Sequence, residues 1–189
     1  MDTVQFTQMR DGAKADYALL HHHEREYIAA LPDRILDGLR ALGDGLGGYR
    51  ISRLHHSLQA ATRAEADGAD VDWIVAALVH DIGDALAPEN HSQMAAAILR
   101  PYVRAEVTWV VAMHGVFQQH YYGQHVGLDP DAREAYRGHE WFDSCERFCE
   151  RWDQSSFDPD YPTEPLEHFQ PMVREVFGRG AFDPAVVGE

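Results

Sequence analysis

Cysteine, basic residues and long hydrophobic stretches are all scarce in this sequence, and each scarcity excludes a class of protein. The only cysteines, Cys145 and Cys149, form neither a disulfide framework nor a CxxC motif, so we interpret both as small core residues. No apolar run reaches the length of about eighteen residues that a membrane-spanning helix needs. Because the N-terminus also lacks a signal-peptide pattern, we expect a soluble, cytoplasmic protein.

Acidic residues dominate the charge. Sixteen lysines and arginines stand against thirty-one aspartates and glutamates, which gives a formal net charge of −15 at pH 7. A surface of this sign repels phosphate backbones and anionic lipids, so we expect no nucleic-acid partner and no membrane partner. The composition leaves the oligomeric state open. Twelve histidines are a high number for this length and call for a separate explanation.

Helix-starting and helix-ending residues occur throughout the chain, whereas strand-type alternation, internal repeats and domain linkers are absent from the sequence. We therefore predict an all-α, single-domain bundle. Helices at residues 1–44 should pack on the core, residues 45–178 should form the main domain, and residues 179–189 should be a loose tail. Residues 118–125 should form a polar and aromatic loop after a helix that ends near His114.

A histidine and an aspartate close the most apolar segment of the chain. His80 and Asp81 follow a run of apolar residues, and Gly83 ends that helix. An imidazole and a carboxylate at the end of a buried segment are costly unless something compensates them, and a bound cation does so. Imidazole and carboxylate ligands suit iron, manganese or zinc, so this dyad predicts a metal site.

Further histidines and an aspartate lie at distances that let them join the dyad. His56 precedes His80 by 24 residues, which places the two on consecutive helices that can meet in the core. His55 remains an alternative to His56. Six ligands of which one carboxylate bridges fit two metal ions better than one. The predicted ligands are His56, His80, Asp81, His91, His114 and Asp153.

This ordered pattern of ligands resembles the HD-domain superfamily, and the resemblance covers roughly residues 45–177. The two histidines beyond the dyad and its partners are similar to those of the binuclear branch, which contains HD phosphohydrolases and mixed-valent diiron oxygenases. The compact size, residues 54–59 and the Trp152-Asp153 pair look most like the oxygenases that act on phosphonates, which are related to myo-inositol oxygenase. Such sequences are often labelled predicted HD phosphohydrolases.

The resemblance implies an HD-type helical bundle that holds two iron ions as an Fe(II)/Fe(III) pair. It further implies that the pair uses O2 to oxidise or cleave a small substrate at the carbon that bears a hydroxyl group. One iron would be bound by His56, His80, Asp81 and Asp153, and the other by His91 and His114 with Asp81 as the bridge. Asp81, His91 and His114 would then be the catalytic residues. Manganese or zinc would satisfy the same ligands.

The sequence departs from the phosphonate oxygenases where their basic residues hold the phosphonate. Those places carry Asp84, Gln118, Glu150 and Phe157 here, which would oppose binding of a dianion. We therefore expect a hydroxylated substrate that is neutral or carries an amine. Candidate substrate residues are Tyr49, Asp84, Gln118, His120 and His125. The alternative to substrate binding is that Tyr49 only packs against its neighbours, and that Asp84 and the loop are only exposed to solvent.

Two other functions fit the same residues. A binuclear phosphohydrolase would use the metals to activate water against a nucleotide or another phosphate ester, but it usually needs cationic contacts to phosphate. Arg53 and Arg151 are the basic residues nearest to the predicted ligands in sequence. A protein that binds metals without catalysis is the third alternative, although open coordination positions are typical of reactive sites.

Overall fold

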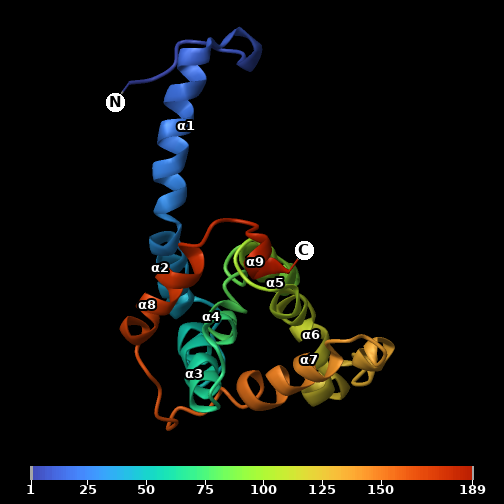
Figure 1. Cartoon of the computed structure of the whole chain (residues 1–189). Coiled ribbons are helices and arrows are strands. Elements are labelled where there is room, and N and C mark those ends of the chain that lie inside the picture. The colour runs from blue at the N-terminus through green and yellow to red at the C-terminus, as the bar shows by residue number, and fades with distance from the viewer. Residues whose placement is uncertain (1, 189) are drawn as a thin grey trace.

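The computed structural model describes residues 2–188, and every regular element within that range is helical (Figure 1). The α-helices are α1 (Lys14–Ala29), α2 (Leu31–Ala41), α3 (Arg53–Ala66), α4 (Val71–Val79), α5 (His91–Leu99), α6 (Ala105–Val126), α7 (Phe142–Phe148), α8 (Leu166–Phe177) and α9 (Pro184–Val187). Turns of 3-10 helix are η1 (Met9–Asp11), η2 (Leu42–Asp44), η3 (Pro88–Asn90) and η4 (Ala132–Tyr136), and η5 (Cys149–Asp153) is a π-helical turn. The predicted all-α, single-domain fold is confirmed.

Helix α4 forms the centre of the bundle. Its residues from Asp72 to Val79 are all buried, and it contacts α3, α6 and α8 (Figure 1). Each fully buried aliphatic side chain contributes about 1.5–3 kcal/mol relative to exposure, so this apolar run ties the surrounding helices together. Helix α5 pairs with α6, and η5 packs on α3. The segments that carry the predicted ligands therefore meet around the C-terminal end of α4.

Side-chain caps define where two of these helices begin. The Ser52 hydroxyl accepts a hydrogen bond of 3.1 Å from the backbone N–H of His55 and so caps the start of α3. Asp70 caps α4 by accepting from the N–H of Trp73 at 3.2 Å. Asp72, in the first turn of α4, forms ion pairs with Arg104 and Arg179.

Helix α6 is longer than the sequence predicted. The expected loop at residues 118–125 is wrong, because α6 continues through it to Val126 and ends where Gly127 adopts a left-handed conformation with φ 79°. No proline interrupts the segment, and glycine within a helix costs only about 1 kcal/mol. At Gly115 the missing side chain is useful, since a Cβ there would lie 2.9 Å from the Ser92 hydroxyl oxygen.

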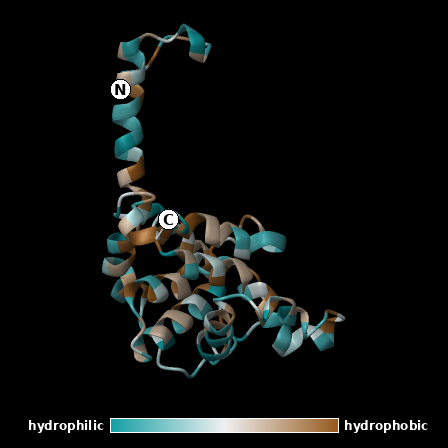
Figure 2. Ribbon diagram, turned by 45° about the vertical axis from the view of Figure 1, so that its right-hand side comes forward, coloured by the Kyte–Doolittle hydropathy of each residue, from teal (hydrophilic) through white to brown (hydrophobic). Residues whose placement is uncertain are grey.

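Helix α1 does not pack on the core, contrary to the prediction for residues 1–44. No residue of α1 is buried, and the helix projects away from the body of the molecule, whereas α2 buries four residues against it (Figure 1). The surface of α1 is mostly hydrophilic (Figure 2). Its apolar residues are too dispersed around the axis to form a wide stripe facing a core.

The C-terminal segment contacts the core, although the sequence predicted a loose tail. Arg179 forms an ion pair of 2.7 Å with Asp72, and its side chain also donates to the backbone carbonyl of Tyr102 at 2.8 Å. Helix α9 follows and buries Val187. No helix within residues 2–188 combines the length and the apolar character that crossing a membrane requires.

Candidate metal centre

The structure brings all six predicted ligands together at the end of α4. Five of them are buried, and the sixth, His91, has a side chain that is 23% exposed. His56 belongs to α3, His80 and Asp81 follow α4, His91 begins α5, His114 lies within α6 and Asp153 ends η5. Three sets of three residues each have their ligand atoms within 4.8 Å of one another, so each set could hold a metal ion. These sets are His56, His80 and Asp81; His80, His114 and Asp153; and Asp81, His91 and His114.

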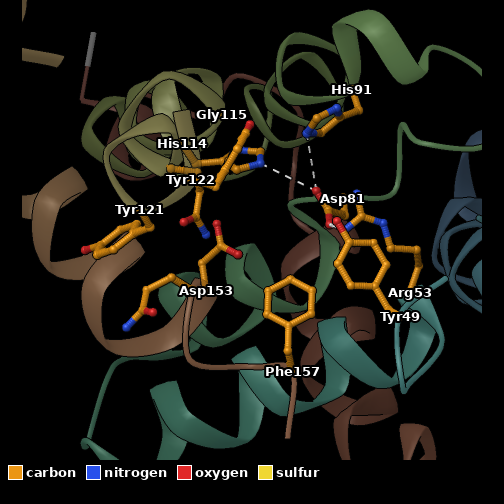
Figure 3. Close-up of a pocket in the computed structure, with 12 residues that line it drawn as sticks. Tyr49, Arg53, Asp81, His91, His114, Gly115, Tyr121, Tyr122, Asp153 and Phe157 are labelled. Carbon is orange, nitrogen blue, oxygen red and sulfur yellow. Dashed lines mark ion pairs between the residues drawn. The ribbon is translucent and has the colours of Figure 1, made fainter. Parts of the chain in front are cut away.

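The Asp81 carboxylate lies between two pairs of imidazoles. Its Oδ2 atom is 3.5 Å from the Nε2 atoms of both His56 and His80. Its Oδ1 atom is 3.4 Å from Nε2 of His91 and 3.5 Å from Nε2 of His114 (Figure 3). Each carboxylate oxygen thus faces one pair, which is the arrangement that a carboxylate bridging two cations requires.

Backbone carbonyl groups fix the tautomer of all four histidines. The Nδ1 atom of each ring lies 2.7–3.1 Å from a carbonyl oxygen three residues earlier in His80, His91 and His114, and from that of Ser156 in His56. A carbonyl oxygen only accepts, so Nδ1 must carry the hydrogen and Nε2 is left with its lone pair. All four Nε2 lone pairs are therefore directed at the cluster, as in histidine ligands of metals.

Asp153 completes the first group of ligands. Its Oδ1 atom is 3.3 Å from Nε2 of His56 and 3.6 Å from Nε2 of His80, while its Oδ2 atom is buried without a hydrogen-bond partner. The π-helical turn that ends at Asp153 aims this carboxylate, and such turns occur frequently at functional sites. A buried carboxylate oxygen without a partner is costly, and a cation would satisfy it.

The charges of the cluster shift the pKa values of its members. Burial lowers the pKa of His56, but the hydrogen bond to Asp153 and the charges of Asp153 and Asp81 outweigh burial and raise it. For His80, burial is likewise outweighed by the charges of Asp81 and Asp153, and the pKa is raised. Burial raises the pKa of Asp81, yet the charge of His80 and the hydrogen bond from His114 hold it well below its ordinary value. The two carboxylates therefore favour a positive charge beside these imidazoles, which a proton or a cation would supply.

Metal ions fit this set of residues. The Nε2 atoms of His56 and His80 are only 3.1 Å apart, and two lone pairs at that distance repel unless a proton or a cation lies between them. The unpartnered oxygen of Asp153 and the fixed tautomers of the histidines also favour a bound cation. The distances from the two carboxylates divide the six residues into two groups that share Asp81. The first consists of His56, His80, Asp81 and Asp153, and the second of Asp81, His91 and His114.

The second group of ligands opens onto a cavity of about 320 Å³ (Figure 3). Asp81, His91, His114 and Asp153 form its floor, while His56 and His80 are fully covered. The rest of the wall is aromatic, amide-bearing or cationic, and consists of Tyr49, Arg53, Gly115, Gln118, Tyr121, Tyr122, Gln154 and Phe157. A small molecule in this cavity would lie directly against the second group.

The structure decides between the two adjacent histidines at the start of α3. His56 reaches the cluster, whereas the Nε2 atom of His55 is buried without a hydrogen-bond partner and belongs to none of the ligand groups. Ring burial also distinguishes them, because His56 stacks on Phe157 with ring centroids 4.4 Å apart. Of the two histidines, only His56 is therefore placed where it could bind a metal ion.

The candidate substrate residues divide into three sets. Tyr49 and Gln118 line the cavity. His120 and His125 do not: His120 lies on another face of α6, and His125 lies about 16 Å along the helix axis from His114. Asp84 is outside the cavity and is ion-paired with Arg53 at 2.6 Å, so neither solvent nor a substrate is its main neighbour.

Sequence reasoning did not single out several residues of the cavity wall. Tyr121 and Tyr122 follow His114 by seven and eight residues, the spacing of one helix face, and a continuous α6 would have revealed them. Arg53, which the sequence indicated as a nearby basic residue but not as part of the site, precedes His56 by three residues and lies on the same side of α3. Burial raises the pKa of Tyr121 to about 12, so its phenol stays protonated.

Comparison with known proteins assigns the family. No curated protein matches the chain. The family model of the HD domain matches residues 53–156, which is more than half of the sequence and includes all six residues of the cluster. The helical fold, the His80–Asp81 dyad and this match agree, and the chain therefore belongs to the HD-domain family.

Proposed function

We propose that this protein is an HD-domain oxygenase that uses two iron ions and O2 to oxidise or cleave a small hydroxylated substrate. The position of the Asp81 carboxylate between two unequal groups of ligands carries the proposal. The first group has four protein ligands, of which His56 and His80 are covered, whereas the second has three and faces the cavity. The second position therefore has room for molecules other than protein side chains, as reactive metal sites do.

The residues of the chain position the reactants. An Fe(II)/Fe(III) pair, when bound, supplies the redox chemistry with O2. His91 and His114 hold the cavity side of the centre, and Asp81 keeps the two positions adjacent. Phe157 covers His56, and Tyr49 stacks on Phe157 with ring centroids 5.2 Å apart, so these rings exclude water from the first group. The Gln118 and Gln154 amides offer hydrogen bonds to a hydroxylated substrate.

A binuclear phosphohydrolase is the second candidate, and Arg53 favours it. Its guanidinium lines the cavity beside Asp81, with Nη1 3.2 Å from Oδ2, where it could contact a phosphate group. Two carboxylates already pair with this guanidinium, however, and within residues 2–188 no other lysine or arginine lines the cavity. This balance of charge is why we prefer a neutral or amine-bearing hydroxylated substrate to a phosphate ester.

One set of assays tests the proposal. The protein is loaded anaerobically with ferrous iron, metal is counted per chain, and the half-oxidised sample is examined by EPR. O2 uptake is then followed with a panel of hydroxylated compounds, and phosphate release from generic esters is measured in parallel with and without oxygen. We expect two irons per chain, an EPR signal from a coupled Fe(II)/Fe(III) pair and substrate-dependent O2 uptake.

The control variant is His55→Ala, which removes an imidazole next to the site but outside the cluster, and it should retain both metals and the activity. Phosphate release that does not depend on oxygen, together with no O2 uptake, would replace the oxygenase with the hydrolase. Two bound metals without either activity would indicate a protein that binds metal without catalysis.

A further inference from the structure

Asp84 lies three residues after the bridging aspartate, in the turn between α4 and η3, and contacts two residues of the cavity wall. Its Oδ2 atom accepts a hydrogen bond from Nε of Arg53 at 2.6 Å. Its Oδ1 atom is 3.4 Å from Nδ1 of His91. The Asp84 side chain is only 13% exposed, so the ion pair with Arg53 is largely shielded from water.

The guanidinium of Arg53 is held from two sides. While Nε binds Asp84, Nη1 is 3.2 Å from Oδ2 of Asp81. Two carboxylates thus use the hydrogen-bonding fork of one cation. A substrate anion in the cavity would have to share the positive charge of this guanidinium with both of them.

Asp84 holds Arg53 from the side away from the metal-facing cavity. Arg53 and His91 line that cavity and also a second cavity of about 220 Å³ beneath the loop after α2. Asp84 lines only the second cavity. It therefore acts on a substrate only through the residues in front of it.

We propose that Asp84 is a positioning residue which holds Arg53 against the centre and thereby disfavours anionic substrates in the cavity. Arg53 is the only lysine or arginine among the residues that line this cavity. With its charge matched by Asp84 and Asp81, the cavity selects hydroxylated molecules without a phosphate or phosphonate group. The inference rests on the proposed function, because it assumes that substrate binds in this cavity beside two metals.

Inorganic phosphate is the probe for this role. Its binding to the metal-loaded protein is measured by calorimetry for the wild type, Asp84→Asn, Arg53→Gln and the double variant. Removing the Asp84 charge frees the guanidinium, so Asp84→Asn should bind phosphate about tenfold more tightly, the size of one charged hydrogen bond. The double variant should lose this gain, because the gain requires Arg53.

Asp37→Asn is the matched control, since it removes one carboxylate that pairs with an arginine, Arg40, on the exposed face of α2. It should leave phosphate affinity unchanged. Metal is counted for every variant, and Asp84→Ser gives the same test if Asp84→Asn does not fold.

Three results would overturn the inference while leaving the metal centre intact in the wild type. They are unchanged phosphate affinity in Asp84→Asn, a gain that persists in the double variant, and loss of the second metal in Asp84→Asn, which would show that Asp84 acts on the metal through His91. A wild-type protein that holds no metal would instead reject the proposed function itself.

Discussion

At the scale of single residues, Asp81 links the two halves of the centre. Its two oxygens face different histidine pairs at 3.4–3.5 Å, so loss of the carboxylate affects both positions at once. His114 lies 3.5 Å from Oδ1 on the cavity side, although its ligand atom is also within 4.8 Å of those of His80 and Asp153. The two residues should therefore differ in what their removal does.

Replacement of Asp81 should abolish binding of both metals. The number of bound metal ions per chain is measured by elemental analysis after anaerobic loading. We expect it to fall from two to nearly none in Asp81→Ala and to about one in His114→Ala. Removal of one ligand or its partner typically weakens metal binding at least 10–100-fold. Equal retention of both metals in Asp81→Ala would show that this carboxylate is not the bridge.

The pKa shifts predict opposite effects of pH on the metal-free and the loaded protein. The raised pKa values of His56 and His80 stabilise the metal-free fold below the ordinary histidine pKa of about 6.5. This contribution is lost as the pH rises through the raised values, so the Tm of the metal-free protein should fall above about pH 6.5. Metals bind the deprotonated rings, and the loaded protein should gain stability over the same range.

Thermal unfolding at a series of pH values, with and without metal, measures this difference. Parallel Tm curves for the two forms would contradict it. At acid pH the Tm of both forms should fall as the pH falls. The lowered pKa of Asp81 stabilises the fold above about pH 4, and that contribution is lost at lower pH.

Residue types and spacing predicted which side chains would gather, but not how charges would pair. The His80–Asp81 dyad and the isolated histidines at helix ends were visible because a polar group that closes an apolar run needs a reason. The ion pair between Arg53 and Asp84 joins residues 31 positions apart and depends on how α3 is rotated against the turn after α4. Such a rotation follows from packing, which periodicity does not specify.

At the scale of elements, the turn between α4 and α5 determines where His91 lies. A Cβ on Gly83 would be 2.7 Å from the backbone oxygen of His91 and 2.9 Å from its Cα, so the start of α5 lies directly against this glycine. Only a residue without a side chain allows that approach.

Gly83→Ala should move the start of α5 and with it His91. We expect destabilisation of about 1–3 kcal/mol, as for overpacking, and weaker binding of the second metal than of the first. Gly47→Ala is the control, because nothing lies within 4 Å of a Cβ there. Denaturant unfolding and metal titration measure both effects. Unchanged metal binding in Gly83→Ala would mean that the turn does not position His91.

Element types were predictable where capping and breaking residues mark the ends. Ser52 and Asp70 begin α3 and α4 as capping residues should. The extension of α6 and the π-helical turn before Asp153 carry no such signal, since polar and aromatic residues fit a loop or a helix equally well. For that reason the sequence did not predict which face of α6 lines the cavity.

At the scale of the whole molecule, α1 stands apart from the bundle that holds the candidate metal centre (Figure 1). Whether a helix packs on a core depends on tertiary contacts, so its existence was predictable and its projection was not. The HD-domain match begins after α2, at residue 53. The centre thus depends on the bundle and not on α1.

Removal of residues 1–29 should leave the metal centre intact. Because no residue of α1 is buried, the truncated protein should keep two metals per chain and the Tm of the full chain to within a few degrees. Elemental analysis and thermal unfolding measure these quantities. Loss of metal on truncation would show that α1 contributes to the fold of the bundle.

The most direct measurement of the central claim is anomalous diffraction at the iron edge from crystals of the iron-loaded protein. We expect two peaks about 3.5–4 Å apart on either side of the Asp81 carboxylate. One peak should lie among His56, His80 and Asp153, and the other beside His91 and His114. A single peak, or peaks remote from Asp81, would contradict it.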